Sequence, residues 1–182
     1  MIGALPKSLE VGGEEYPINS DFRAALLVFE AYGDHGLSPL NKQLTLLEIV
    51  YAEEIPRNTN AAVKQALWFL DIGEEAKSNA GGVGRKTMDY KQDEQLLFSA
   101  VNAVVGKDVR EESYMHWWTF YGLCQAISPD SMIAHIINIR SKRAKGEKLE
   151  KYEQKFYAEN RHLIDFRTSD EDYELLVSQL RR

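Results

Sequence analysis

The sequence predicts a mainly α-helical protein, in which a multi-helix, bundle-like domain over residues 1–146 is followed by a C-terminal helical extension over residues 147–182. Two observations lead to this prediction. Apolar residues recur at the three- and four-residue spacing of amphipathic helices almost continuously from Phe22 to Phe156. Before that run, a Gly12-Gly13 pair separates two short segments that predict a small N-terminal β-hairpin over residues 8–18. With 182 residues, of which 44% are hydrophobic, the chain is long enough to bury a core.

The hairpin prediction depends on its turn. Glycine adopts the positive φ angles that a two-residue turn requires, so residues 8–11 and 14–18 are expected to pair across Gly12-Gly13. Pro17 indicates an edge or the end of the pairing, because proline has no backbone N–H to donate. Two strands alone are marginally stable in water, so the hairpin must pack against helices or against a partner chain.

Three helices are predicted between residues 20 and 73, each opened by a capping side chain and closed by glycine or proline. Their expected caps are Ser20, Ser38 before Pro39, and Asn58 or Thr59. Their expected inward stripes are Phe22, Leu26 and Phe29; Leu40, Leu44, Leu47 and Tyr51; and Val63, Leu67 and Leu70.

Five further helices are expected. They cover residues 89–105, the aromatic segment 113–127, the segment that opens at Ser128-Pro129, a polar segment at 147–160, and a short helix capped by Thr168-Ser169. Inward residues are expected on the first, third and last of these five helices. They are Leu97, Val101 and Val104; Ile133, Ile136 and Ile137; and Tyr173, Leu176, Val177 and Leu180, respectively.

The last segment, residues 163–182, needs a surface to lie on, because a terminal helix this short is marginal in water. Its own domain, a neighbouring subunit or a helix of a partner protein could supply that surface.

The composition points to a cytoplasmic protein. Twenty-two basic residues against 28 acidic residues give a net charge of −6, which disfavours nucleic acid as a partner. The single cysteine, Cys124, cannot form an internal disulfide. The N-terminus does not read as a signal peptide, and no run of about 18 apolar residues predicts a membrane span.

The sequence predicts no catalytic residues, no metal and no nucleotide or organic cofactor. The glycine-rich stretch 80–87 lacks both glycines of a phosphate-binding P-loop. Glu159 and His162 form one Glu-x-x-His pair, whereas di-iron bundles need two such pairs and two further glutamates. Cys124 lies among apolar positions, so a core role is favoured over a cysteine–histidine nucleophile, which stays as the least favoured alternative.

A basic stripe follows the sixth predicted helix. A solvated helix that carries ion pairs is the favoured interpretation, with Glu147 and Lys151 in the favourable i,i+4 order, and contacts with phosphates or an acidic partner are the alternative. The stripe consists of Arg140, Lys142, Arg143, Lys145, Lys148 and Lys151.

Aromatic residues are densest at His116-Trp117-Trp118. Neighbouring tryptophans on a helix point about 100° apart, so both are buried only if the helix is covered on two sides. A central core helix, and a core helix that also forms a subunit interface, both satisfy this requirement. The candidate residues for self-association or partner binding are Tyr16, Ile18, Phe22, Trp117, Trp118, Tyr121, Tyr173, Leu176, Val177 and Leu180.

Several sequence blocks, in order and at the expected separations, are those of a known family: Leu5-Pro6-x-Ser8-x-Glu10-Val11, Tyr16-Pro17-Ile18-Asn19 with Asp21-Phe22-Arg23, Asp89-Tyr90 to Asp93, His116-Trp117-Trp118-x-Phe120 with Leu123, and Ile139-Arg140. Together they resemble the bacteriophage gene product fifteen family, which is encoded between the major tail protein and the tape-measure protein. The resemblance covers about residues 5–145, and from Glu147 onward no match is found.

This resemblance implies a non-catalytic tail assembly chaperone. Such a protein binds the tape-measure protein in the cytoplasm of the bacterial host, self-associates, and is absent from the mature virion. It also implies the major tail protein as a further partner. A structural tail component or adaptor is the alternative function.

Overall fold

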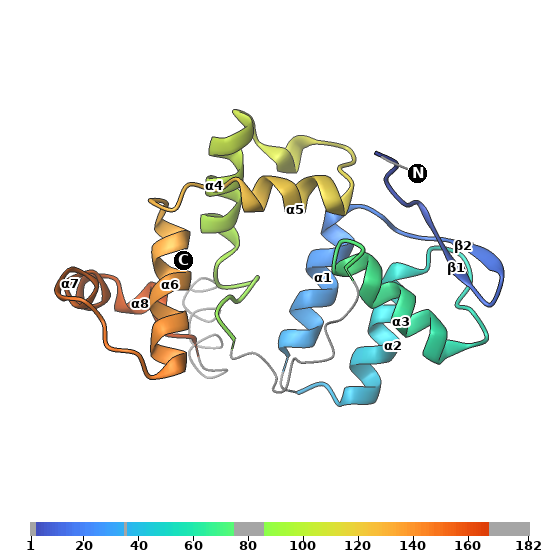
Figure 1. The fold of residues 1–182 in the computed structure, drawn as a ribbon, viewed down its shortest axis with the longest axis horizontal. Helices are drawn as coiled ribbons and strands as arrows, with labels where there is room; N and C mark the ends of the chain where they lie inside the picture. The colour runs from blue at the N-terminus through green and yellow to red at the C-terminus, as the bar shows by residue number, and fades with distance from the viewer. Residues whose placement is uncertain (1–2, 35, 75–85, 168–182) are drawn as a thin grey trace, which may run out of the picture. The chain divides into compact units, whose positions relative to one another are not determined.

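The computed structural model describes residues 3–34, 36–74 and 86–167, and within them the chain is mainly helical with one two-stranded sheet (Figure 1). This confirms the predicted fold class. In chain order the elements are β1 (Ser8–Val11), β2 (Glu14–Pro17), α1 (Phe22–Gly33), α2 (Pro39–Val50), α3 (Thr59–Leu70), α4 (Glu94–Val105), a 3-10 turn (Val109–Glu111), α5 (Trp117–Gln125), α6 (Met132–Lys145), α7 (Lys151–Glu159) and α8 (Arg161–Ile164).

The N-terminal hairpin has the predicted turn. Val11 pairs with Glu14, and the antiparallel register continues to Ser8 opposite Pro17. Both turn glycines have positive φ, 66° at Gly12 and 87° at Gly13, which is the conformation that closes a two-residue hairpin loop. The hairpin packs on α3 through β1 (Figure 1), so helices supply the support that two strands require.

Contacts divide the chain into two compact units. The first contains residues 1–84 and 101–127, and the second contains residues 85–100 and 128–182. Helix α4 is therefore shared, with its first part in the second unit and its last turns in the first unit. The predicted domain boundary at residue 146 is a separate division and stays a prediction.

The core of the first unit is built by α1, α2, α3 and α5. The Phe22 ring of α1 stacks on the Phe120 ring of α5, with 4.3 Å between centroids, and both side chains are fully buried. Full burial of one phenylalanine side chain stabilises a fold by about 1.5–3 kcal/mol. Further buried members are Val28, Leu46, Leu47, Val50, Ala62, Ala66, Phe69 and Trp117.

The core of the second unit is smaller. Three buried isoleucines, Ile136 and Ile139 of α6 and Ile164 of α8, form its centre. Partly buried apolar side chains surround them: Leu96, Leu149, Phe156, Tyr157 and Leu163. Residues 147–164 thus pack on α6.

Several predicted helix boundaries are wrong by one or more residues. The side chain of Asp21, not Ser20, caps α1 by accepting from the Arg23 N–H. Ser131, not Ser128, caps α6, and α5 begins at Trp117 rather than near residue 113. Ser38 and Asn58 cap α2 and α3 as predicted.

Three predicted inward stripes are also wrong in part. On α2, Leu47 and Tyr51 are buried, but Leu40 and Leu44 are exposed. On α3 the buried residues are Ala62, Ala66, Phe69 and Leu70, whereas Val63 is only half-buried and Leu67 is exposed. Small alanine side chains allow the neighbouring elements to approach this face closely, and a pattern search for large apolar residues overlooks them. On α4, Val104 is likewise exposed.

The predicted polar helix at 147–160 is shorter than expected and is followed by an unpredicted helix. Helix α7 begins at Lys151, where Glu150 and Glu153 form a reciprocal capping box, and α8 follows after Asn160. The predicted helix capped by Thr168-Ser169 lies outside the described residues. Among the helices that the structure describes, none combines the length and apolar character needed to cross a membrane.

Candidate functional site

His116 joins the start of α5 to the N-terminal segment of the chain. Its Nδ1 accepts a hydrogen bond from the Trp118 N–H at 3.0 Å, and its Nε2 lies 2.8 Å from the carbonyl oxygen of Pro6. Because Nδ1 accepts, the hydrogen of the neutral imidazole is assigned to Nε2, which donates to that carbonyl. Burial lowers the pKa of His116, which favours this neutral form. The histidine therefore acts as a helix cap and a tether.

The two following tryptophans fasten α5 to the end of α3. The Trp117 indole donates to the Leu70 carbonyl at 2.9 Å, and the Trp118 indole donates to the Phe69 carbonyl at 2.8 Å. The last carbonyls of a helix have no partner within that helix, and the Trp117 indole satisfies one of them at Leu70. The Phe69 carbonyl also accepts from the Ile72 N–H, so the Trp118 indole is its second donor. Trp117 is buried within the chain, whereas Trp118 is half-buried.

The other candidate binding residues are divided between core and surface. Ile18 and Phe22 are buried, as is Trp117, so these three side chains belong to the core of the first unit. Tyr16 and Tyr121 are half-buried. The remaining candidates, Tyr173, Leu176, Val177 and Leu180, lie outside the described residues.

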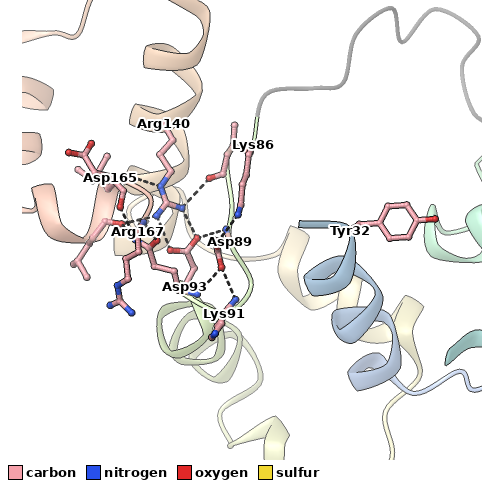
Figure 2. Close-up of polar contacts among 12 residues, drawn as sticks. Tyr32, Lys86, Asp89, Lys91, Asp93, Arg140, Asp165 and Arg167 are labelled. Carbon is pink, nitrogen blue, oxygen red and sulfur yellow. Dashed lines mark hydrogen bonds and ion pairs between the residues drawn. The ribbon is translucent and has the colours of Figure 1, made fainter. Parts of the chain in front are cut away.

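A buried ion pair dominates the second unit (Figure 2). The Arg140 guanidinium donates to both carboxylate oxygens of Asp93, at 2.5 and 3.0 Å, and only 2% and 1% of the two side chains are exposed. Bidentate geometry of this kind makes the strongest charge-assisted hydrogen bonds. We did not expect this pair, because the two residues are separated by 47 positions in the sequence.

Arg140 also holds the C-terminal end of α8. Its Nε and Nη2 donate to the carbonyl oxygens of Ile164 and Leu163, both at 2.7 Å, and its Nη1 lies 3.3 Å from the Thr87 carbonyl. The guanidinium carbon is 4.2 Å from the centre of the Phe166 ring, which adds a cation–π contact. One side chain thus links α6 to the end of α8 and to the segment at Thr87.

Gln92 reinforces the same connection. Its amide nitrogen donates to the carbonyl oxygens of Leu163 and Asp165, and its amide oxygen accepts from the Arg167 N–H. Within the described residues, no buried side-chain nitrogen or oxygen lacks a hydrogen-bond partner. The cluster around Arg140 is therefore saturated, and it positions the chain rather than offering ligands.

Glu153 forms a second buried polar contact, between α7 and α6. Its carboxylate accepts from the Lys142 ammonium at 2.7 Å, from the Asn138 amide at 2.9 Å and from the Glu150 N–H at 2.8 Å. These donors, Lys142 first, lower the pKa of Glu153. Carboxylate and ammonium together hold α7 on α6.

We predicted that the basic stripe lies on a solvated helix. This prediction is wrong for Arg140, which is buried. The predicted Glu147–Lys151 helical pair is also wrong, since α7 begins at Lys151 and Glu147 instead lies 4.0 Å from Lys145. The exposed members Lys145, Lys148 and Lys151 are solvated as expected.

The structure gives little support to catalysis or metal binding. Burial raises the pKa of the Cys124 thiol to about 12, so the nucleophilic thiolate is disfavoured near neutral pH. Glu159 and His162 are exposed and lie on different helices, α7 and α8. The described residues contain no group of three or more histidine, cysteine or acidic side chains that could hold a metal ion. Residues 80–85 of the glycine-rich stretch are outside the description.

Large apolar side chains are exposed on α1 and α2, which pack against each other. Leu40 is 63% exposed and Leu44 is 45% exposed on α2, and Leu27 is 55% exposed on α1. Leu40 and Leu44 are four residues apart and share one face of α2. Leu40 and Leu44 form the candidate binding surface, which we call the α2 apolar face.

Within the described residues the buried polar side chains are hydrogen-bonded, and large apolar side chains of α2 are exposed. The chain belongs to the Bacteriophage Gp15 protein family, whose match covers residues 1–165. This family indicates a phage structural or tail-related protein. The match extends beyond residue 145, so the expectation that the resemblance ends before Glu147 is wrong. No curated protein and no solved structure gives a significant match.

Proposed function

We propose that this protein is a tail assembly chaperone that binds the tape-measure protein in the host cytoplasm, self-associates while it does so, and leaves before the virion is complete. The α2 apolar face carries the proposal. A long helical partner with apolar stripes needs a complementary apolar surface, and helix-in-groove recognition reads residues at i and i+4. Leu40 and Leu44 present that spacing to solvent.

The α2 apolar face continues a buried stripe. Leu47 lies on the same side of the helix, three residues beyond Leu44, and it is buried. A partner helix that lies over Leu40 and Leu44 would therefore extend the core. Each Å² of apolar surface buried in this way contributes about 25 cal/mol to the binding free energy. One subunit offers only two leucines, so its own affinity is weak. Stable binding therefore depends on many subunits along one tape-measure chain. The net charge of −6 favours solubility of such an assembly.

Co-expression of the tape-measure protein with this protein in bacteria tests the proposal. The wild type should keep the tape-measure protein in the soluble fraction. The double variant Leu40→Glu/Leu44→Glu should lose this effect, because two carboxylates would face an apolar partner. The matched control Asn41→Glu/Gln43→Glu adds the same charge at exposed positions of the same helix and should retain it.

Circular dichroism of both variants must match that of the wild type. If the Leu40/Leu44 variant is folded and still solubilises the tape-measure protein, the α2 apolar face is not the binding surface. If the wild type itself has no effect, the chaperone function is wrong.

A further inference from the structure

The outer edge of β1 carries unpaired backbone groups. In an antiparallel pair, residues alternate between those that bond to the partner strand and those whose N–H and C=O point away. The Ile18 N–H donates to the Lys7 carbonyl at 2.9 Å, and the two-residue turn closes at Val11 opposite Glu14. Residues 7, 9 and 11 therefore face β2, and Ser8 and Glu10 direct their backbone groups outward.

The pairing of Ser8 with Pro17 agrees with this alternation. Proline has no N–H, so the position opposite it is of the non-bonded type. Among the described residues, neither Ser8 nor Glu10 makes a backbone hydrogen bond from its outward groups. Two donors and two acceptors are thus available along one short edge.

The outer edge of β2 is closed by contrast. Pro17 removes one donor from that edge, and its carbonyl already accepts from the Ala52 N–H at 3.2 Å. Proline and an added contact are devices by which proteins protect a strand edge from further pairing. The hairpin is therefore protected on its β2 side and open on its β1 side.

A groove of about 710 Å³ lies along the open edge. One wall is β1, including Ser8 and Glu10, and the other wall belongs to α3 and the turn after it, including Leu67 and Trp68. Helix α3 packs against β1 (Figure 1), so the two walls are held together within the first unit. Addition of a peptide strand between a sheet edge and a helix is an established mode of peptide recognition.

The groove is acidic as well as partly apolar. Among the described residues that line it, Glu10, Asp71 and Glu74 are acidic and Lys64 is basic. An occupant with basic side chains would be attracted, and apolar side chains at alternate positions would meet Leu67 and Trp68. A second copy of β1 would bring its own acidic groove, so like charges oppose that occupant.

We propose that an extended, basic segment of a partner protein binds this groove and adds to β1 as a third strand. The backbone groups of Ser8 and Glu10 provide the hydrogen bonds, and the carboxylates of Glu10, Asp71 and Glu74 select the positive charge. This site is separate from the α2 apolar face and does not depend on the proposed chaperone function.

Nuclear magnetic resonance titration with a synthetic peptide tests the inference. The probe is the acetylated and amidated peptide Lys-Val-Lys-Val-Lys-Val, and the control peptide has the same sequence with alternate amides N-methylated. We expect the probe to shift the amide signals of Ser8 and Glu10 and to slow their hydrogen exchange. The N-methylated peptide, which lacks the donors of a strand, should bind about tenfold more weakly.

Two proline variants provide the matched control. Glu10→Pro removes one outward N–H and one carboxylate from the β1 edge, and Glu15→Pro removes the same groups from the β2 edge, since Glu15 pairs with Glu10. Binding should weaken about tenfold in Glu10→Pro and remain within about twofold in Glu15→Pro. If Glu10→Pro disrupts the hairpin, the N-methylated peptide decides the question on the wild type.

Three results would overturn the inference. Equal binding of the two peptides would show that no strand is added. Equal loss in both proline variants would show that the β1 edge is not special. Protection of Ser8 and Glu10 that rises with protein concentration in the absence of peptide would identify a second copy as the occupant.

Discussion

Arg140 is buried in the second unit and makes five hydrogen bonds there. A buried guanidinium is costly to desolvate, and here the carboxylate of Asp93 and three carbonyl oxygens compensate for that cost. Removing one partner of such a pair leaves the other charge buried and unpaired. We expect Arg140→Ala to lower the free energy of unfolding by about 3–5 kcal/mol.

Arg143 is the matched control on the same helix. Its ion pair with Asp165 is partly solvated, with side chains 43% and 34% exposed, so Arg143→Ala should cost about 1 kcal/mol or less. Urea denaturation followed by circular dichroism measures both values. Similar losses for the two variants would mean that burial of the Asp93–Arg140 pair has no special weight.

Glu153 makes stability depend on pH. Its pKa is lowered in the folded state by the Lys142 ammonium and by N–H donors, relative to an ordinary value of 4.5. The folded state therefore binds this proton less readily than the unfolded state, and the stabilisation is fully present above pH 4.5. It is lost as the pH falls through the lowered pKa of the folded state.

Glu153→Gln should therefore reduce stability at neutral pH and make it less dependent on pH below 4.5 than that of the wild type. Thermal unfolding between pH 3 and pH 7 follows the difference, and Glu159→Gln, at an exposed position, is the control. An unchanged acid dependence in Glu153→Gln would contradict the assignment.

The contacts of single side chains were harder to predict from the sequence than the helices. Asp93 and Arg140 are far apart in the chain, and nothing local in either segment indicates that the two charges meet in the interior. Both lie in blocks that carry the family resemblance, as do Pro6 and His116, which also meet in space. Long-range hydrogen bonds therefore join the sequence blocks that carry the resemblance. No single block indicates which other block it contacts.

Among the elements, α3 ends at a position where two tryptophan rings lie close to the backbone. Gly73 has a φ of +82°, and a Cβ placed there would lie 3.1 Å from the Trp118 ring and 3.2 Å from the Trp68 ring. Gly106 has a similar φ of +78° but no atom within 4 Å of such a Cβ. Gly106→Ala should cost about 1–2 kcal/mol from the left-handed backbone alone.

Gly73→Ala should cost clearly more than Gly106→Ala, because the two indole rings must also move. Urea denaturation gives the two free energies, and tryptophan fluorescence reports the displacement of the rings. If both substitutions cost the same, contact between Gly73 and the tryptophans does not constrain α3.

Residues near the C-terminus divide into two parts. Ile164 is 1% exposed in the core of the second unit, and its carbonyl accepts from Arg140. Deletion of residues 163–182 should therefore unfold that unit. Deletion of residues 168–182 alone, which removes the predicted stripe of Tyr173, Leu176, Val177 and Leu180, should leave the core intact and reduce self-association.

Light scattering and circular dichroism together measure the outcome of these truncations. A 168–182 deletion that is folded and keeps the oligomeric state of the wild type would exclude this segment from self-association. A 163–182 deletion that keeps its full stability would show that Ile164 contributes little to the core.

Elements were easier to predict than their buried faces. Turn glycines, capping side chains and prolines act locally, so the hairpin and the starts of α2 and α3 are correctly placed. Burial depends on which neighbour covers a helix, and the sequence does not reveal that Ala62 and Ala66 face the core while Leu40 and Leu44 face solvent. The candidate binding surface is therefore made of residues that the sequence pattern assigned to the interior.

For the whole molecule, family membership over residues 1–165 indicates a phage structural or tail-related protein, and the exposed α2 apolar face is the surface on which the proposed chaperone function rests. A protein that shields a partner temporarily must expose apolar surface and yet remain soluble, and a net charge of −6 serves the second requirement. A structural tail component would instead keep its binding surface covered permanently in the assembled particle. A chaperone is bound only during assembly, whereas a structural component stays bound in the finished tail.

Quantitative mass spectrometry of phage assembly tests this difference most directly. Complexes that contain the tape-measure protein are isolated from infected cells before tail completion, and mature virions are purified from the same culture. We predict that this protein is abundant in the early complexes, several copies per tape-measure chain, and absent from the virions. A fixed copy number in purified virions would contradict the chaperone function and identify a structural component of the tail.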